Sequence, residues 1–156
     1  MPSRIEQIPR VFFAAMRAYA GNMQNGTIRE VPGLETVLFE VDCFKACHYF
    51  VAAHGRYKFE QIIILCDGEP AWTMSWYGWC VESAIPFLGR ALRKAYDQRG
   101  FFGGRGPKTV PESGMLYMNS VEQPSSWRRF NGQEEIFDHD DRLIGWHRYQ
   151  GILLLE

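Results

Sequence analysis

Two stretches of the chain look like copies of one β-hairpin. The first, FEQIIILCDGEPAWTMSWYG, begins at Phe59, and the second, FNGQEEIFDHDDRLIGWHRYQG, begins at Phe130. Both run from Phe and Gln through an apolar strand and an acidic turn to a strand that carries Trp, Tyr and Gly. The interval from Gln to Tyr, which is Gln61 to Tyr77 in the first copy, is the same in the second. We therefore expect one strand register in both hairpins.

The length and charge of the chain favour a single domain. A chain of 156 residues buries roughly 70% of its unfolded surface, which suffices for one core. We therefore expect one domain spanning 1–156. The formal net charge of −1 gives no general electrostatic attraction to nucleic acid or to an anionic membrane, so neither partner is expected.

The apolar segments predict neither a membrane span nor a secretion signal. The longest uninterrupted apolar runs, such as 62–66 and 152–155, are far shorter than the ~20 residues of a membrane helix. The N-terminus lacks the apolar core of a signal peptide, which predicts a cytoplasmic protein. The four cysteines lie in apolar segments, so we expect reduced thiols.

The first half predicts a helix followed by strands. Phe12, Met16 and Tyr19 recur at helical spacing after Pro9, and Gly21 is typical of the residue that ends a helix. The pattern becomes strand-like from Thr27, with a turn at Pro32–Gly33. This half therefore leads from a short amphipathic helix into antiparallel strands.

The first hairpin has a recognisable turn. Asp67–Gly68 favours a two-residue type I′ turn. That turn predicts that Ile63 lies opposite Trp72, which gathers the large side chains on one face.

The second half repeats this order. Ser83 is a candidate helix cap, Pro86 fits the first helical turn, and Gly100 ends the helix. A long irregular loop is expected over 101–114, followed by a strand at 115–121 and the second hairpin. The chain thus predicts an α+β fold.

The predicted architecture is a curved antiparallel sheet with two helices packed on one face. The sheet is built from two hairpin-containing repeats, at approximately 9–78 and 83–151. The sequence leaves the oligomeric state open.

Four motifs resemble an uncharacterised bacterial family, the DUF5680 domain. They are AYAG at 18–21, DGEPAWTMSWYG at 67–78, RGP at 105–107 and FNGQE at 130–134. Family members occur alone and fused behind helix-turn-helix regulators, and we expect this chain to be a stand-alone member. The resemblance implies a fold and a regulatory association but no activity.

The first hairpin departs from one family motif. It has Glu60 and Ile62 where the Phe-x-Gly-x-Glu pattern has glycine and glutamate. No role for a glutamate in the first half is therefore implied.

The aromatic side chains suggest a pocket at the junction of the repeats. Trp72 and Trp76 lie on one face of the predicted strand, and Trp146 of the second copy is expected to join them as the wall of an apolar pocket. The alternative is that these rings pack under the helices as core.

Glu134 is the candidate polar group of this pocket. A carboxylate within an apolar strand must find a partner or shift its pKa. Facing the pocket, it would bind a cationic ligand or act as a general base. Glu135 points the other way. The alternative is a solvated side chain facing Arg142 or Arg148 across the hairpin.

Two tyrosines and one loop complete the candidate binding site. Tyr77 and Tyr149 are related by the repeat and are expected to orient a ligand, unless both hydroxyls are buried against the backbone. The loop around Arg105 is expected to cover the ligand or to be structural. A phosphate site in its glycines is disfavoured, because they follow a helix rather than open one.

We expect no metal, cofactor or catalytic residue. Cys43 and Cys47 on one strand would stand about 13 Å apart and could not share an ion. The acidic turn at 138–141 lacks the pattern of a calcium loop. No nucleophile elbow or triad order is present.

The leading hypothesis is a small-molecule-binding or sensor domain that is not an enzyme. Its duplicated plan looks like that of the effector-binding domains of bacterial regulators. One alternative is a protein-interaction module, such as an antitoxin or immunity protein, anchored by Trp79 and Trp127. Another is a hydrolase or isomerase with Glu134 as general base, which requires a raised pKa for that carboxyl group.

Overall fold

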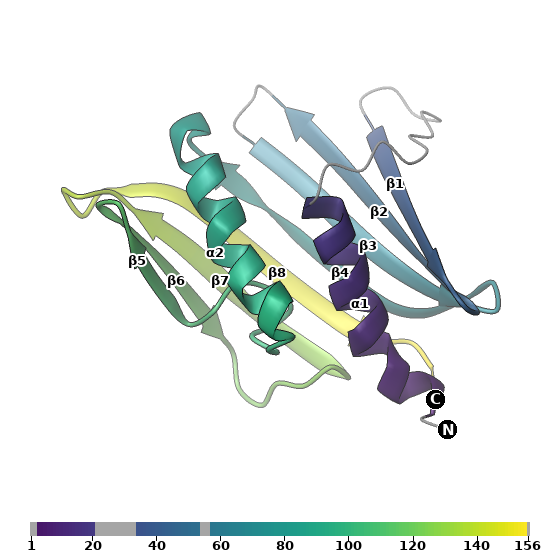
Figure 1. Ribbon diagram of the computed structural model, residues 1–156. Helices are drawn as coiled ribbons and strands as arrows, with labels where there is room; N and C mark the ends of the chain where they lie inside the picture. The colour runs from purple at the N-terminus through teal and green to yellow at the C-terminus, as the bar shows by residue number, and fades with distance from the viewer. Residues whose placement is uncertain (1–2, 21–33, 54–56, 156) are drawn as a thin grey trace.

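The computed structural model describes residues 3–20, 34–53 and 57–155, and the two halves have the same order of elements (Figure 1). The elements of the first half are α1 (Arg4–Ala20), β1 (Leu34–Val41), β2 (Phe44–Ala53), β3 (Tyr57–Cys66) and β4 (Glu69–Cys80). Those of the second are a short 3₁₀ turn (Glu82–Ala84), α2 (Ile85–Gln98), β5 (Thr109–Glu112), β6 (Met115–Val121), β7 (Arg129–Phe137) and β8 (Leu143–Leu153).

The described strands form one eight-stranded antiparallel sheet in the order β1-β2-β3-β4-β8-β7-β6-β5. Each half is a four-stranded meander, and the two meanders join where β4 pairs with β8. The sheet does not close, because β1 and β5 are its edges. Helices α1 and α2 lie side by side over one face (Figure 1). The predicted α+β fold is confirmed, and this order of elements fits a duplication.

The turn of the first hairpin is the predicted one, but the register behind it is shifted. Asp67 and Gly68 both have positive φ angles, 53° and 87°, as a type I′ turn requires. A bulge then follows at Ala71, so that Trp72 lies opposite Ile64 rather than the predicted Ile63. Such a bulge suits Pro70, which has no N–H to donate to the ladder.

The two hairpins do not share one register, contrary to the sequence prediction. Gln61 pairs with Ser75 in the first hairpin. The equivalent partner of Gln133 would be His147, yet Gln133 pairs with Arg148. A slip of one residue turns a strand over. The residues of β8 that face the helices therefore correspond in the repeat to residues of β4 that face away from them.

Helix α1 begins earlier than predicted. Ser3 and Glu6 form a capping box, in which the Glu6 N–H donates to Ser3 Oγ at 3.3 Å and the Ser3 N–H donates to Glu6 Oε2 at 2.7 Å. Pro9 therefore lies inside the helix. The predicted helix end at Gly21, the strand start at Thr27 and the turn at Pro32–Gly33 lie outside the described residues.

Helix α2 also differs at its ends. Ser83 lies in the 3₁₀ turn, and Ala84 occupies the cap position without a side-chain hydrogen bond. At the C-terminal end, Arg99 adopts the left-handed conformation and the Gly100 N–H donates to Ala95 O. The loop predicted over 101–114 is shorter, because it contains strand β5.

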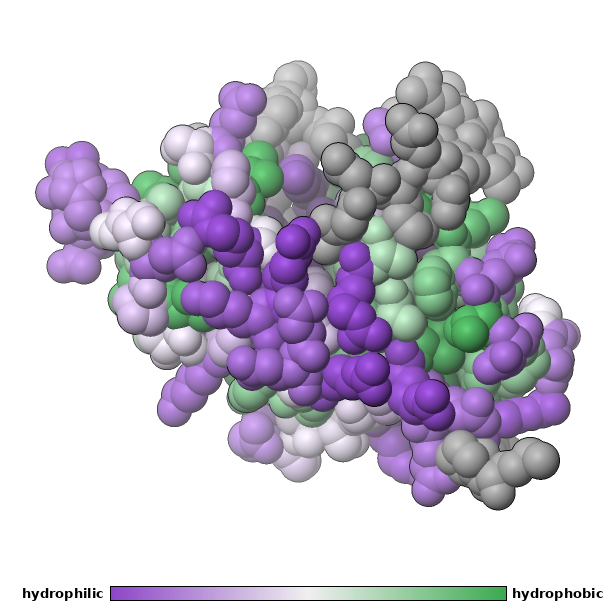
Figure 2. All heavy atoms as spheres, in the orientation of Figure 1, coloured by the Kyte–Doolittle hydropathy of each residue, from purple (hydrophilic) through white to green (hydrophobic). Residues whose placement is uncertain are grey.

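The core fills the space between the helices and the sheet. Phe12 of α1 lies edge-on to Trp72 and to Trp127, with ring centroids 5.3 and 5.4 Å apart. Trp127 is thus packed against the core rather than presented as an exposed anchor. The outer surface of the helices is hydrophilic (Figure 2). Neither described helix is long and apolar enough to cross a membrane.

One glycine is required where the two halves meet. Gly78 on β4 has φ 156°, and a Cβ there would lie 2.0 Å from the backbone oxygen of Trp146 on β8. A methyl group at this position would push the two central strands apart. Gly89 is an exposed residue in the middle of α2, and a Cβ there would meet no atom within 4 Å.

We expect Gly78→Ala to lower the free energy of unfolding by about 2–3 kcal/mol, because backbone must move to admit the methyl group. Gly89→Ala is the matched control and should raise it by about 0.5–1 kcal/mol through helix propensity. Chemical denaturation of both variants measures these changes. A neutral Gly78→Ala variant would contradict the close approach of β4 and β8.

Candidate functional site

A carboxylate lies at the centre of the protein, on the face of the sheet that the helices cover. Strand β7 alternates buried and half-buried residues from Phe130 to Phe137, and Glu134 falls in the buried set. Its side chain has no solvent exposure. A charge in such a place must be balanced by partners.

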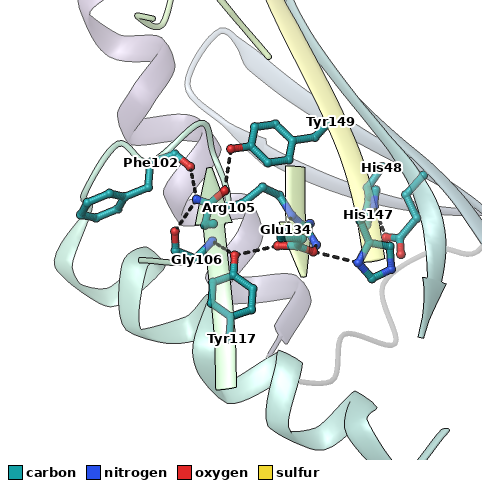
Figure 3. A network of polar contacts seen from close by, with 10 residues as sticks. His48, Phe102, Arg105, Gly106, Tyr117, Glu134, His147 and Tyr149 are labelled. Atoms are coloured by element: carbon teal, nitrogen blue, oxygen red, sulfur yellow. Dashed lines mark hydrogen bonds and ion pairs between the residues drawn. The ribbon is translucent and has the colours of Figure 1, made fainter. Parts of the chain in front are cut away.

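Three side chains balance the Glu134 carboxylate (Figure 3). Arg105 approaches with two nitrogens, Nη2 to Oε1 and Nε to Oε2, the latter at 3.2 Å. The Tyr117 hydroxyl donates to Oε2 at 2.7 Å. His147 Nδ1 lies 2.9 Å from Oε1. A two-pronged guanidinium–carboxylate pair is the strongest form of this interaction.

Hydrogen bonds tie the loop that carries Arg105 to the sheet. The Gly106 N–H donates to the Tyr117 hydroxyl at 3.0 Å, and Asn119 Nδ2 donates to the carbonyls of Phe102 and Gly106, both at 2.8 Å. Tyr149 donates in turn to Asn119 Oδ1 at 2.6 Å. Arg105 has 3% of its surface exposed. The loop is therefore part of the core.

A second buried pair lies near the Trp76 ring. His48 Nε2 on β2 lies 3.0 Å from Glu60 Oε2 on β3. The His48 ring lies 5.3 Å from the Trp76 ring, and the Arg105 Cζ lies 4.9 Å from the Trp76 centroid. Trp76 thus lies close to both pairs, and a guanidinium over an indole face is a favourable contact.

Both buried glutamates remain ionised in the folded protein. Burial by itself would raise the pKa of Glu134, but the Arg105 charge and the His147 hydrogen bond outweigh it and hold the pKa well below the usual range. For Glu60, burial is likewise outweighed by His48, and the pKa is lowered. Neither carboxylate has the raised pKa that a general base in a pocket requires.

The structure brings five of the seven predicted site residues to the face of the sheet under the helices. All five are almost fully buried, and side chains fill the space between them. They are Trp72, Trp76, Arg105, Glu134 and Tyr149.

The other two predicted residues, Tyr77 and Trp146, lie on the opposite face. Their rings are 5.9 Å apart and Tyr77 is 50% exposed. The predicted joining of Trp146 with Trp72 and Trp76 is therefore wrong, and Tyr77 and Tyr149 cannot orient one ligand. The cause is the register difference between the hairpins, which turns β8 over relative to β4.

The face without helices carries a groove along the junction of the two halves. At one end, a hollow of about 370 Å³ is lined mainly by apolar and aromatic side chains: Val51, Tyr57, Lys58, Phe59, Tyr77, Gly78, Trp79 and Trp146. A middle hollow of about 310 Å³ shares Phe59 and Tyr77 with it. The middle hollow shares Ser75, Asn131 and Gln150 with a third one of about 450 Å³. The three hollows therefore form one groove.

The charged side chains of the groove are all basic. They are Arg148 in the middle and Arg129 at the far end. Lys58 also lines the aromatic end, but its side chain alternates with Phe59 and its charge acts on the buried Glu60 and Cys80. None of the described residues that line the three hollows carries a carboxylate.

Glu122 adjoins the groove, because it lies 3.2 Å from Arg148 and accepts a hydrogen bond from Asn131 Nδ2. It offsets part of the positive charge of Arg148. With two arginines against one adjoining carboxylate, the polar part of the groove is net basic although the whole chain is nearly neutral.

Sequence reasoning missed several members of the buried network. Tyr117 and Asn119 alternate on β6 with the exposed Met118 and Ser120, so a period of two would have placed them on the buried side. His48 and Glu60 become partners only through the β2–β3 pairing. No local signal marks such a pair.

Comparison with known proteins gives no match among family models, curated proteins or solved structures. The resemblance to the DUF5680 family stays a prediction. Fold and site together define the chain only as an α+β protein with a buried ion-pair network beneath its helices and, on its helix-free face, a groove whose polar part is net basic.

We expect Glu134→Gln to lower the free energy of unfolding by about 3–5 kcal/mol, because it leaves Arg105 buried without a counter-charge. Glu135→Gln is the matched control. It removes an equal charge from the next residue of β7, on the opposite side, and should change stability by about 0.5 kcal/mol or less. Urea denaturation measures both. Equal effects in the two variants would refute the structural role of Glu134.

Acid should destabilise the protein through the same carboxylates. Because the pKa values of Glu134 and Glu60 lie below the ordinary 4.5 in the folded chain, the unfolded chain takes up protons first as pH falls. Their stabilising contribution is fully present above about pH 5 and decreases below it, by up to about 1.4 kcal/mol per pH unit for each group. In a pH series of unfolding free energies, Glu134→Gln should show a shallower slope than wild type, whereas Glu122→Gln should keep it.

Proposed function

We propose that the protein is a binding module for a small amphipathic anion, and that the ligand lies in the groove on the helix-free face. The observation that carries this proposal is the aromatic end of the groove joined to a net basic, hydrogen-bonding end. The proposed site still lies between the two halves of the chain, but on the face of the sheet without helices and not on the buried face.

The aromatic end suits a ring or a short aliphatic group. Tyr57, Phe59 and Tyr77 are each about half exposed, at 55%, 47% and 50%. Trp146 stands edge-on to Tyr77. Exposed aromatic side chains that gather in one hollow are typical of a binding surface, because a ligand removes them from water.

The other end suits an anionic head group. Arg129 and Arg148 supply positive charge, and Ser75 and Gln150 supply neutral hydrogen-bonding groups. Glu122 holds Arg148 and Asn131 at the edge of this end, and an anionic ligand would compete with it for Arg148. From Thr73 to Trp79, β4 runs roughly 20 Å along the groove. An extended molecule with an apolar body and a carboxylate, sulfonate or phosphate group matches this length and polarity.

The geometry does not favour the enzyme alternative. Glu134 has no exposed surface, and the pKa of its carboxyl group is lowered rather than raised. Its oxygens already accept bonds from Arg105 and Tyr117. A role in stability explains these contacts without a reaction.

The fluorescent anion anilinonaphthalene sulfonate combines an aromatic body with a sulfonate and is therefore the probe of choice. We expect saturable binding of one probe molecule per chain. Tyr77→Ser should weaken binding about tenfold, since one ring contact is lost. Arg148→Gln should weaken it several-fold and reduce its salt dependence. Fluorescence titration at two salt concentrations measures these changes.

Leu143→Ser is the matched control, because Leu143 is 41% exposed but lies outside the groove. It should bind the probe as wild type does, with all melting temperatures alike. Equal weakening in every variant, or none in any, would refute the groove as the site.

Native mass spectrometry of protein purified from its own host supplies a second test, in which a retained small anion supports the proposal. If a protein chain is retained instead, and Tyr77→Ser abolishes its binding, the protein-interaction alternative replaces this proposal.

A further inference from the structure

Two cysteines from separate turns meet at one end of the sheet. Cys43 lies in the turn between β1 and β2, and Cys66 is the last residue of β3. The pairing of β2 with β3 places Cys66 opposite Phe44, and the Asp67 N–H donates to Cys43 O at 2.9 Å. The two sulfur atoms are 3.7 Å apart. A backbone hydrogen bond thus holds the thiols together.

Solvent reaches this pair through Cys43, whereas the other two cysteines are buried. Cys43 is exposed, whereas Cys66 is buried directly behind it. Cys47 and Cys80 are buried. An oxidant in solution therefore meets Cys43 first, and the nearest thiol that can resolve the product is Cys66.

We propose that Cys43 and Cys66 form a dithiol site that hydrogen peroxide converts into a disulfide. The Cys43 sulfur attacks one peroxide oxygen, the O–O bond breaks, and Cys43 sulfenic acid and water form. The Cys66 sulfur then attacks the Cys43 sulfur, the S–O bond breaks, and the hydroxyl leaves as a second water with the Cys66 proton. Two thiols are oxidised by two electrons, and one peroxide is reduced to two waters.

The neighbouring charges favour this oxidation over a metal ion. Cys43, Cys66 and Asp67 have the spacing of metal ligands. However, the guanidinium of Arg4 lies 2.6 Å from Asp67 Oδ2 and competes with a metal ion for that carboxylate. Burial and the adjacent Cys43 raise the pKa of Cys66, which opposes the thiolate form that a metal ion requires.

The disulfide would be a new cross-link between two turns, because all four cysteines are free in the described part of the chain. It closes a loop between residues 23 positions apart. Such a cross-link restricts the unfolded chain, so oxidation should raise the melting temperature. The turn after β3 would then be fixed to the turn before β2.

The test treats the full chain with hydrogen peroxide, then unfolds it, alkylates the remaining thiols and maps the peptides by mass spectrometry. We expect a Cys43–Cys66 cross-linked peptide, with Cys47 and Cys80 alkylated. The melting temperature should rise by several degrees and return after treatment with dithiothreitol.

Two variants separate the steps. Cys66→Ser should leave a Cys43 sulfenic acid that dimedone captures, whereas Cys47→Ser should form the same disulfide as wild type. The proposal is overturned if Cys66 remains alkylated after oxidation, if Cys43 reaches only sulfinic or sulfonic acid, or if a chelator releases a metal ion that masks both thiols before peroxide is added.

Discussion

The buried ion pair between Glu134 and Arg105 is the interaction on which the arrangement of the second half depends. A carboxylate without solvent in the middle of a sheet is strongly unfavourable unless a cation reaches it. Here the cation comes from the segment after α2, so that segment must fold inward. Tyr117 and Asn119 then hold its backbone in place. One charge on a strand thus determines the path of a loop distant from it in sequence.

Two hairpins of similar sequence turn different residues toward the helices. In each hairpin the strand pairing shifts by one residue after the turn, at Ala71 in the first and at Ile144 in the second. The turn itself is one residue longer in the second hairpin, because Cys66 pairs with Glu69 whereas the Asp138 N–H donates to Arg142 O. Because side chains alternate along a strand, Tyr77 is exposed while its counterpart Tyr149 is buried. The two similar hairpins therefore form a packed interior under the helices and a groove on the other side, instead of two equal sites.

Local patterns were sufficient for the fold but not for the site. The Asp67–Gly68 turn and the amphipathic pattern of α2 depend on neighbouring residues, and both were predicted. Periodicity shows neither the bulge at Ala71 nor the longer turn of the second hairpin, and these two features decide which residues of β4 and β8 face the helices. The contact between Arg105 and Glu134 joins residues 29 positions apart, so only the folded chain shows it. The sequence did not show that the predicted site residues lie on two opposite faces of the sheet.

The short edge strand β5 has a consequence for self-association. Exposed sheet edges invite another chain to add a strand and so lead to aggregation. Strand β5 has only four residues, and Pro111 within it has no N–H to donate to an added strand. At the opposite edge, β1 is eight residues long and carries the exposed carboxylates of Glu35 and Glu40, which repel a second copy of the same strand. The molecule can thus keep an open sheet without growing into a fibril from either side.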